Sequence, residues 1–305
     1  MIPYEPKQWF NLFTLKRSDT ARKLAPYILG FGAYALAIVL LEKHVFHLSD
    51  ESILRNVTLL HTLLGFVISL LLVFRTNTAY DRWWEGRRLW GSLVNNSRNL
   101  GLKLHQMLPA EATDVRQFYQ SMIPNFAFAL KNHLRDDTQP SEFADTPLLR
   151  FTDLRADEHI PNQLASAMFG QAYALEQRGI LRPEHLLVLN LELQSFMEIC
   201  GACERIKKTP IPYSYSSFIK KFIVSYCLTL PIGFTFSLHY LVVPFTMFVF
   251  YVLASLEVLA EEVESPFGND ENDLPLDSIC QSIDKTVRQG FEHPTPVVLN
   301  AAVRK

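Results

Sequence analysis

The chain has 305 residues, of which 49% are hydrophobic and 20% charged, and its formal net charge is −2. This charge provides no broad positive field for nucleic acid, so we expect no nucleic-acid partner. The four cysteines are too scattered for a disulfide framework; they are Cys200, Cys203, Cys227 and Cys280. The hydrophobic share is ordinary for a soluble protein. The distribution of apolar residues must therefore separate a membrane protein from a soluble one.

Two uncharged stretches in the N-terminal quarter are long enough to cross a bilayer. Residues 24–41 contain no charged side chain, and neither do residues 57–74. About 18 residues at 1.5 Å each make roughly 27 Å of helix, close to the thickness of the hydrocarbon layer. We therefore predict transmembrane helices at about 24–46 and 56–78.

A third apolar stretch, residues 222–260, is about twice as long as one crossing requires. Its only charged residue is Glu257. Polar and amphipathic side chains at residues 237–240 suit a turn at the membrane interface. We predict two further transmembrane helices within residues 219–262, with Pro231 in the third and Pro244 in the fourth.

Basic residues fix the expected orientation. If the chain crosses four times, three basic clusters fall on one side, and by the positive-inside rule that side is the cytoplasm. The prediction is a multi-pass protein of the cell membrane with both termini in the cytoplasm. The clusters are Lys16, Arg17, Arg22 and Lys23; Arg75, Arg82, Arg87 and Arg88; and Lys207, Lys208, Lys220 and Lys221.

The region between the second and third spans has the charge density and periodicity of a helical domain. Apolar residues recur at spacings of three and four, which predicts α-helices. The expected helices are residues 89–107, 115–134, 161–177 and 183–208. The fold class is therefore an all-α membrane protein with four transmembrane helices and a large cytosolic helical domain. The expected divisions are 1–80, 81–218, 219–262 and 263–305.

No motif of enzymatic chemistry is complete in this sequence, and we predict no catalytic residues. Cys200 and Cys203 form a CxxC pair, which elsewhere binds metal or carries redox chemistry. No second CxxC and no paired histidines accompany it. The alternatives are a membrane-anchored helical enzyme or scaffold with a thiol or metal site, and tight helix packing around small residues.

An acidic turn at residues 265–277 follows the fourth predicted span. It is rich in oxygen ligands, which suits calcium, but lacks the glycine and final glutamate at EF-hand spacing. The alternative is a turn in which Asp273 caps the following helix.

Residues 74–85, which read FRTNTAYDRWWE, follow the second span and carry Arg82, Trp83 and Trp84. Cys200-Gly201, Ile211-Pro212 and Pro266-Phe267-Gly268 follow in that order. This pattern resembles the bestrophin family of ion channels, and the chain is similar to a bacterial homologue over nearly its whole length. The resemblance implies a homopentamer in the lipid bilayer, with an axial pore that passes small inorganic ions.

The resemblance also implies a narrow neck in the pore, formed by the second span. Phe66, Leu70 and Phe74 match the three neck positions of the family, and their spacing places them on one helical stripe. A hydrophobic constriction can gate by dewetting. The alternative is that these residues contact lipid or the bundle core, as large apolar residues of any transmembrane helix do.

A second constriction, at the cytosolic exit, falls by the same resemblance on Glu184. The family default is chloride or another anion, but five carboxylates around an exit attract cations, so Glu184 slightly favours monovalent cations. The alternatives are a solvated glutamate in a first helical turn, or an alignment shift that places His185 or Leu186 at the exit.

Calcium binding is also expected only through the resemblance. Asp270 and Asp273 coincide with two acidic ligands of the family, but Asn272 interrupts the acidic run. Passive conduction requires no cofactor.

Overall fold

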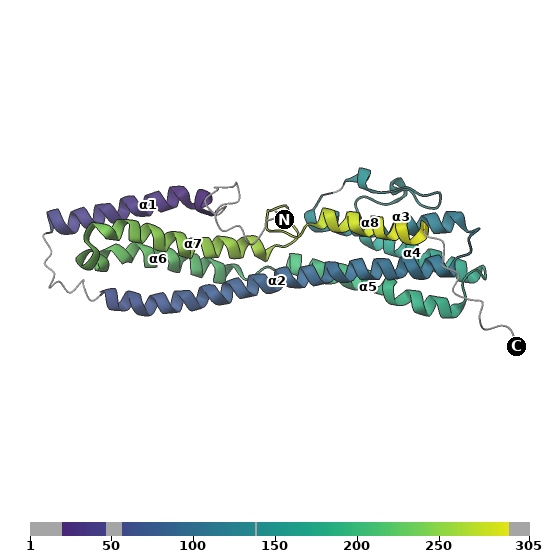
Figure 1. The fold of residues 1–305 in the computed structure, drawn as a ribbon, viewed down its shortest axis with the longest axis horizontal. Coiled ribbons are helices and arrows are strands. Elements are labelled where there is room, and N and C mark those ends of the chain that lie inside the picture. The colour runs from purple at the N-terminus through teal and green to yellow at the C-terminus, as the bar shows by residue number, and fades with distance from the viewer. Residues whose placement is uncertain (1–19, 47–56, 138, 293–305) are drawn as a thin grey trace. The chain divides into compact units, whose positions relative to one another are not determined.

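The computed structural model describes residues 20–46, 57–137 and 139–292, and the described part contains helices and no strands (Figure 1). This confirms the all-helical prediction. The tail from residue 293, the N-terminal basic residues Lys16 and Arg17, and residues 47–56 lie outside the described ranges. The helices are α1 (Thr20–Leu40), α2 (Val57–Met107), α3 (Thr113–Arg135), α4 (Ile160–Gln177), α5 (Pro183–Lys208), α6 (Tyr213–Leu238), α7 (Val242–Glu264) and α8 (Leu276–Glu292), with short π or 3₁₀ turns η2 (Leu41–Val45), η4 (Pro140–Glu142), η5 (Phe151–Asp153) and η6 (His239–Leu241).

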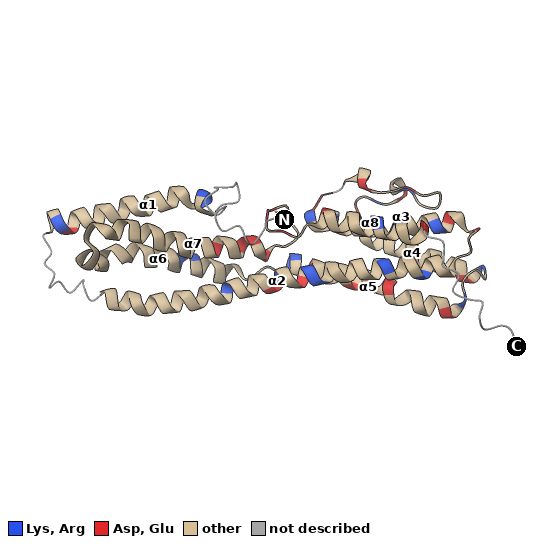
Figure 2. Cartoon of the chain, in the orientation of Figure 1, with Lys and Arg blue, Asp and Glu red and all other residues tan. Residues whose placement is uncertain are grey.

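Four helical segments of the described chain are long and apolar enough to cross a membrane: Thr20–Val45, Val57–Met107, Pro183–Lys208 and Tyr213–Glu264. The last contains both α6 and α7, which reverse direction at η6, where the sequence predicts the turn. Charged side chains are sparse along α1, α6 and α7 except near their ends (Figure 2). The predicted spans thus correspond to α1, the first part of α2, α6 and α7.

The first compact unit comprises residues 1–84, 210–266 and 270–273. In it α1 packs on α6 and α7, and α6 packs on α7. Leu24, Ile68, Leu72, Ile223 and Phe250 belong to one buried cluster that joins four helices. Stacking of Phe31 on Phe250, with ring centroids 4.2 Å apart, adds an aromatic contact between α1 and α7.

The second compact unit comprises residues 85–209, 267–269 and 274–305. In it α3 packs on α4, α5 and α8, and α5 also packs on α4. The apolar residues of α8 recur at helical spacing, so that one face is buried and the other carries charge; the buried residues are Leu276, Cys280, Ile283, Val287 and Phe291. Although α5 meets the length and apolarity criteria for a span, it packs within this unit.

The helices predicted at 56–78 and 89–107 are parts of one helix, α2, which is 51 residues long. No proline interrupts the connecting residues, and an isolated glycine such as Gly86 costs a helix only about 1 kcal/mol. The division between the two units falls within α2, between Trp84 and Glu85. The predicted helix start at Pro183 is confirmed, and the helix predicted from residue 115 begins two residues earlier, at Thr113.

Candidate functional site

The predicted neck residues lie on the face of α2 that the single chain leaves uncovered. Phe66 is 72% exposed, Leu70 46% and Phe74 57%. The opposite face is buried within the first unit, as Ile68 and Leu72 show. The uncovered face is available to lipid, to other copies of the chain or to a pore.

The side chains of His61 and Ser69, on the same helix, form hydrogen bonds within the first unit. His61 is buried, and its Nδ1 lies 3.0 Å from the Val57 carbonyl oxygen while its Nε2 lies 3.1 Å from Thr229 Oγ1 on α6. The Ser69 hydroxyl donates to the Gly65 carbonyl oxygen at 2.7 Å. His61 therefore forms a hydrogen bond with the neighbouring helix α6.

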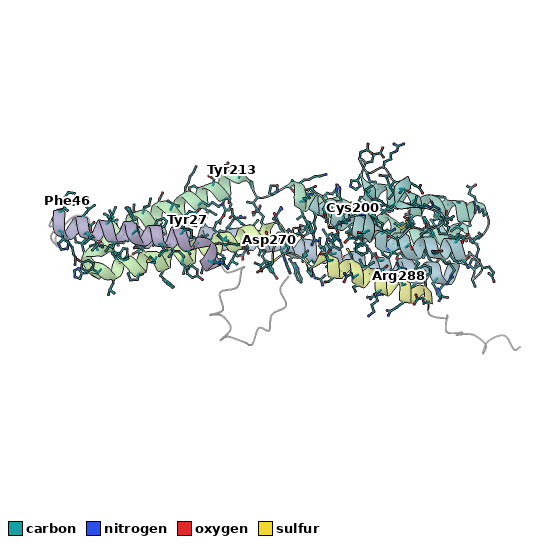
Figure 3. All side chains as sticks on the ribbon, turned by 90° about the horizontal axis from the view of Figure 1, so that it is seen from above. Tyr27, Phe46, Cys200, Tyr213, Asp270 and Arg288 are labelled. Atoms are coloured by element: carbon teal, nitrogen blue, oxygen red, sulfur yellow. The ribbon has the colours of Figure 1, made fainter. Side chains whose placement is uncertain are left out.

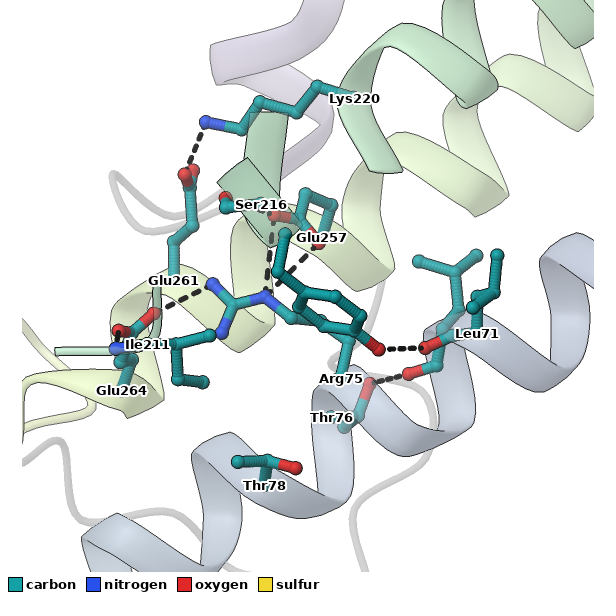
Figure 4. A network of polar contacts seen from close by, with 12 residues as sticks. Leu71, Arg75, Thr76, Thr78, Ile211, Ser216, Lys220, Glu257, Glu261 and Glu264 are labelled. Carbon is teal, nitrogen blue, oxygen red and sulfur yellow. Dashed lines mark hydrogen bonds and ion pairs between the residues drawn. The ribbon is translucent and has the colours of Figure 1, made fainter. Parts of the chain in front are cut away.

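Arg75, the residue after Phe74, is buried and holds α2 to α7 (Figure 4). Its Nη2 lies 2.7 Å from Glu264 Oε2, and its Nε lies 3.5 Å from Glu257. Ser216 on α6 donates to Glu257 Oε1 at 3.0 Å, and the Ile211 amide donates to Glu264 Oε1 at 2.7 Å. The Arg75 guanidinium and the two carboxylates therefore join α2 to α7, and Ser216 and Ile211 bind the same carboxylates.

From the sequence, Arg75 is predicted only as one of the basic residues that set the topology, and this network is not predicted. The available signal was a pair of charges at the ends of apolar stretches, Arg75 after the second and Glu257 within the last. Charged residues in spans usually face the protein interior and pair with one another.

Arg82, Trp83 and Trp84, which carry the family resemblance, lie on the next turns of α2. Arg82 Nε donates to the Glu264 carbonyl oxygen at 3.1 Å, and Trp83 Nε1 donates to the Asn272 carbonyl oxygen at 3.1 Å. Trp84 is 46% exposed, and its ring lies nearly parallel to that of Tyr80, with centroids 6.5 Å apart. Arg82 and Trp83 thus attach α2 to the last residue of α7 and to the turn that follows it.

The two predicted calcium ligands lie in a turn of the first unit. Asp273 is buried, and its Oδ2 accepts the Asp270 amide hydrogen at 2.7 Å. Among the described residues, this turn does not assemble three histidine, cysteine or carboxylate ligand atoms. Ca²⁺ takes six to eight oxygen ligands. As folded, the turn does not fit the ion through its side chains, and we derive no role for calcium.

The predicted aperture residue Glu184 is exposed in the first turn of α5. His185 is half-buried, and its Nδ1 accepts the Arg182 amide hydrogen at 3.4 Å. Leu186 is also half-buried. Of the three candidates, Glu184 is the most accessible.

Cys200 and Cys203 lie on α5 in the second unit. Figure 3 labels Cys200. Both are buried free thiols. Burial raises the pKa of Cys200 to about 12 and raises that of Cys203 as well. Such thiols are protonated near neutral pH and are poor nucleophiles and metal ligands, which favours helix packing as their role.

The apolar helices long enough to cross a membrane, with the uncovered apolar face of α2, define a multi-pass membrane protein. The chain belongs to the bestrophin family: the family described as Bacterial/Fungal Bestrophin protein matches residues 1–289. It is therefore an ion channel and not an enzyme.

Curated relatives and solved structures cover most of the chain. A voltage-dependent anion channel-forming protein of Nostoc sp. is 32% identical over 92% of this chain and 91% of its own length. The voltage-dependent anion channel-forming protein YneE of Escherichia coli K12 is 31% identical over 93% and 92%. A crystal structure of a bestrophin homologue from Klebsiella pneumoniae is 27% identical, with a TM-score of 0.80 over 89% of this chain and all of that one.

Proposed function

We propose that five copies of this chain form a membrane channel that conducts small monovalent ions passively through an axial pore. The observation that carries the proposal is the uncovered stripe of Phe66, Leu70 and Phe74. A symmetric ring of chains would turn this stripe inward and line a hydrophobic neck. Passive conduction needs no cofactor.

The neck is tested by replacing its three residues together. The triple variant Phe66→Ala, Leu70→Ala and Phe74→Ala widens the constriction and lowers the dewetting barrier. We expect a severalfold higher open probability or conductance in planar bilayers. The matched control replaces three exposed leucines of α1, Leu29, Leu36 and Leu40, by alanine. Wild-type currents from a correctly assembled triple variant would contradict the neck.

We propose that Glu184 sets the ion preference at the cytosolic exit. A ring of five carboxylates there attracts cations and repels anions. The relatives are named voltage-dependent anion channel-forming proteins, so anion conduction is the competing outcome.

Reversal potentials under a KCl gradient decide between the two. Cation preference is expected for the wild type and a clear shift toward anions for Glu184→Ala, with Glu198→Ala, another exposed glutamate of α5, unchanged. An anion-selective wild type whose reversal potential is unaffected by Glu184→Ala would overturn the assignment.

We also propose that the second unit and both termini face the cytoplasm. Arg22 and Lys23 at the start of α1, Arg87 and Arg88 on α2, and Lys220 on α6 support this orientation through the positive-inside rule. An impermeant amine-reactive reagent applied to spheroplasts should leave Lys103 and Lys285 unmodified, and should modify both after permeabilisation. Modification of either before permeabilisation would reverse the orientation.

A further inference from the structure

Two imidazoles and one carboxylate meet in the second unit. His133 is near the end of α3, His159 precedes the first residue of α4, and Glu204 is on α5. Glu204 Oε1 lies 2.6 Å from His133 Nε2 and 2.7 Å from His159 Nε2. The three candidate ligand atoms all lie within 4.8 Å of one another.

This set of donors is typical of a transition-metal site. Two imidazole nitrogens and a carboxylate oxygen suit Zn²⁺, which takes three such protein ligands when a fourth position holds water. Burial lowers the pKa of His133, although its hydrogen bond to Glu204 opposes that effect. Burial raises the pKa of Glu204, but hydrogen bonds from His159 and His133 outweigh it and the net pKa is lowered.

An ion and its water can reach the cluster. The side chains of His133, His159 and Glu204 are 30%, 27% and 21% exposed. A cavity of about 140 Å³ adjoins His133 and is lined by Asn132, His133 and Ile160 among others.

We propose that His133 Nε2, His159 Nε2 and Glu204 Oε1 bind one Zn²⁺-class divalent ion per chain, with water completing the coordination. Glu204 Oε1 is now at hydrogen-bond separation from each imidazole nitrogen, whereas tetrahedral Zn²⁺ at about 2.0–2.1 Å from each ligand places neighbouring ligand atoms roughly 3.3 Å apart. Binding therefore requires an outward shift of about 0.6 Å, within the reach of side-chain rotation.

Two neighbouring contacts oppose the ion and limit its affinity. His159 Nδ1 accepts the Asn162 amide hydrogen at 3.1 Å, so in the metal-free state Nε2 carries the proton of a neutral ring. Metal at Nε2 moves that proton to Nδ1 and breaks this cap, which weakens binding by roughly fivefold to tenfold. Lys208 Nζ lies 3.6 Å from Glu204 Oε2, but its side chain is 67% exposed and free to turn away.

Calorimetric titration with Zn²⁺ tests the site on the full chain in detergent, purified without a histidine tag and treated with chelator. We expect one ion per chain with a Kd in the micromolar range and at least tenfold weaker binding for Glu204→Gln. The matched control is Glu198→Gln on the same helix. His159→Asn is the second variant, because asparagine keeps the cap of α4 and removes the imidazole; it should bind at least tenfold more weakly.

Hydrogen exchange gives an independent readout. Zn²⁺ should speed exchange of the Asn162 amide in the wild type, because its acceptor is lost. No binding to the wild type, or equal binding to the wild type, Glu204→Gln and His159→Asn, would overturn the proposal and leave a hydrogen-bonded triad only.

Discussion

At the scale of single residues, Arg75 is the side chain with the largest expected energetic effect. It is buried together with Glu257, and it forms ion pairs with Glu257 and with the half-buried Glu264. Arg75→Met leaves two carboxylates without their cation, and breaking a buried pair in this way costs about 3–5 kcal/mol. Thermal unfolding in detergent should show a large loss of stability.

Arg88→Met is the control for this change, because Arg88 is an exposed arginine of the same helix. A solvent-exposed charge contributes about 0–1 kcal/mol. If the two variants lose the same stability, Arg75 does not hold the helices together.

At the scale of elements, close approach of α6 to α2 depends on Gly233. A Cβ at this position would lie 3.2 Å from the Thr58 backbone nitrogen, and the Thr58 hydroxyl donates to the Gly233 carbonyl oxygen at 3.2 Å. Gly30 on α1 has no atom within 4 Å of such a Cβ. Alanine favours a helix over glycine by about 1 kcal/mol. Gly30→Ala should therefore raise the melting temperature by a few degrees, and Gly233→Ala should lower it; equal increases would contradict the close contact.

The meeting of α3, α4 and α5 at His133 and Glu204 predicts a dependence of stability on pH. Both pKa values are lowered in the folded chain, from ordinary values of 6.5 and 4.5. The unfolded chain therefore binds protons first as pH falls, and stability decreases. The loss begins near pH 6.5 through His133 and continues below 4.5 through Glu204.

Melting temperatures measured with chelator between about pH 8 and pH 5 check this dependence, because the His133 loss falls in that window. His133→Gln should flatten the curve, whereas His185→Gln at the start of α5 should not. A wild-type curve that rises toward pH 5 would contradict the sign.

At the scale of the whole molecule, the uncovered apolar face of α2 predicts assembly. A single chain exposes Leu59, Leu63, Phe66, Leu70 and Phe74 along one helix. Native mass spectrometry from detergent should give five chains, as the bestrophin resemblance implies. A monomer or dimer that still conducts would refute the proposed axial pore, because no ring of neck residues would exist.

The sequence by itself determined the apolar spans, the turn near residue 239 and most helix bounds, because these depend on local composition and periodicity. It also identified the family through Arg82, Trp83 and Trp84. The continuity of α2 was not predicted, since a change from apolar to charged composition does not end a helix.

Only the tertiary structure decided which distant side chains meet. Arg75 with Glu264, and His133 with His159 and Glu204, are separated by many residues, so no spacing rule applies to them. Their distances follow from how the helices pack within each unit. Packing also decided that Cys200 and Cys203 are buried, which turns a motif of redox or metal chemistry into two unreactive thiols.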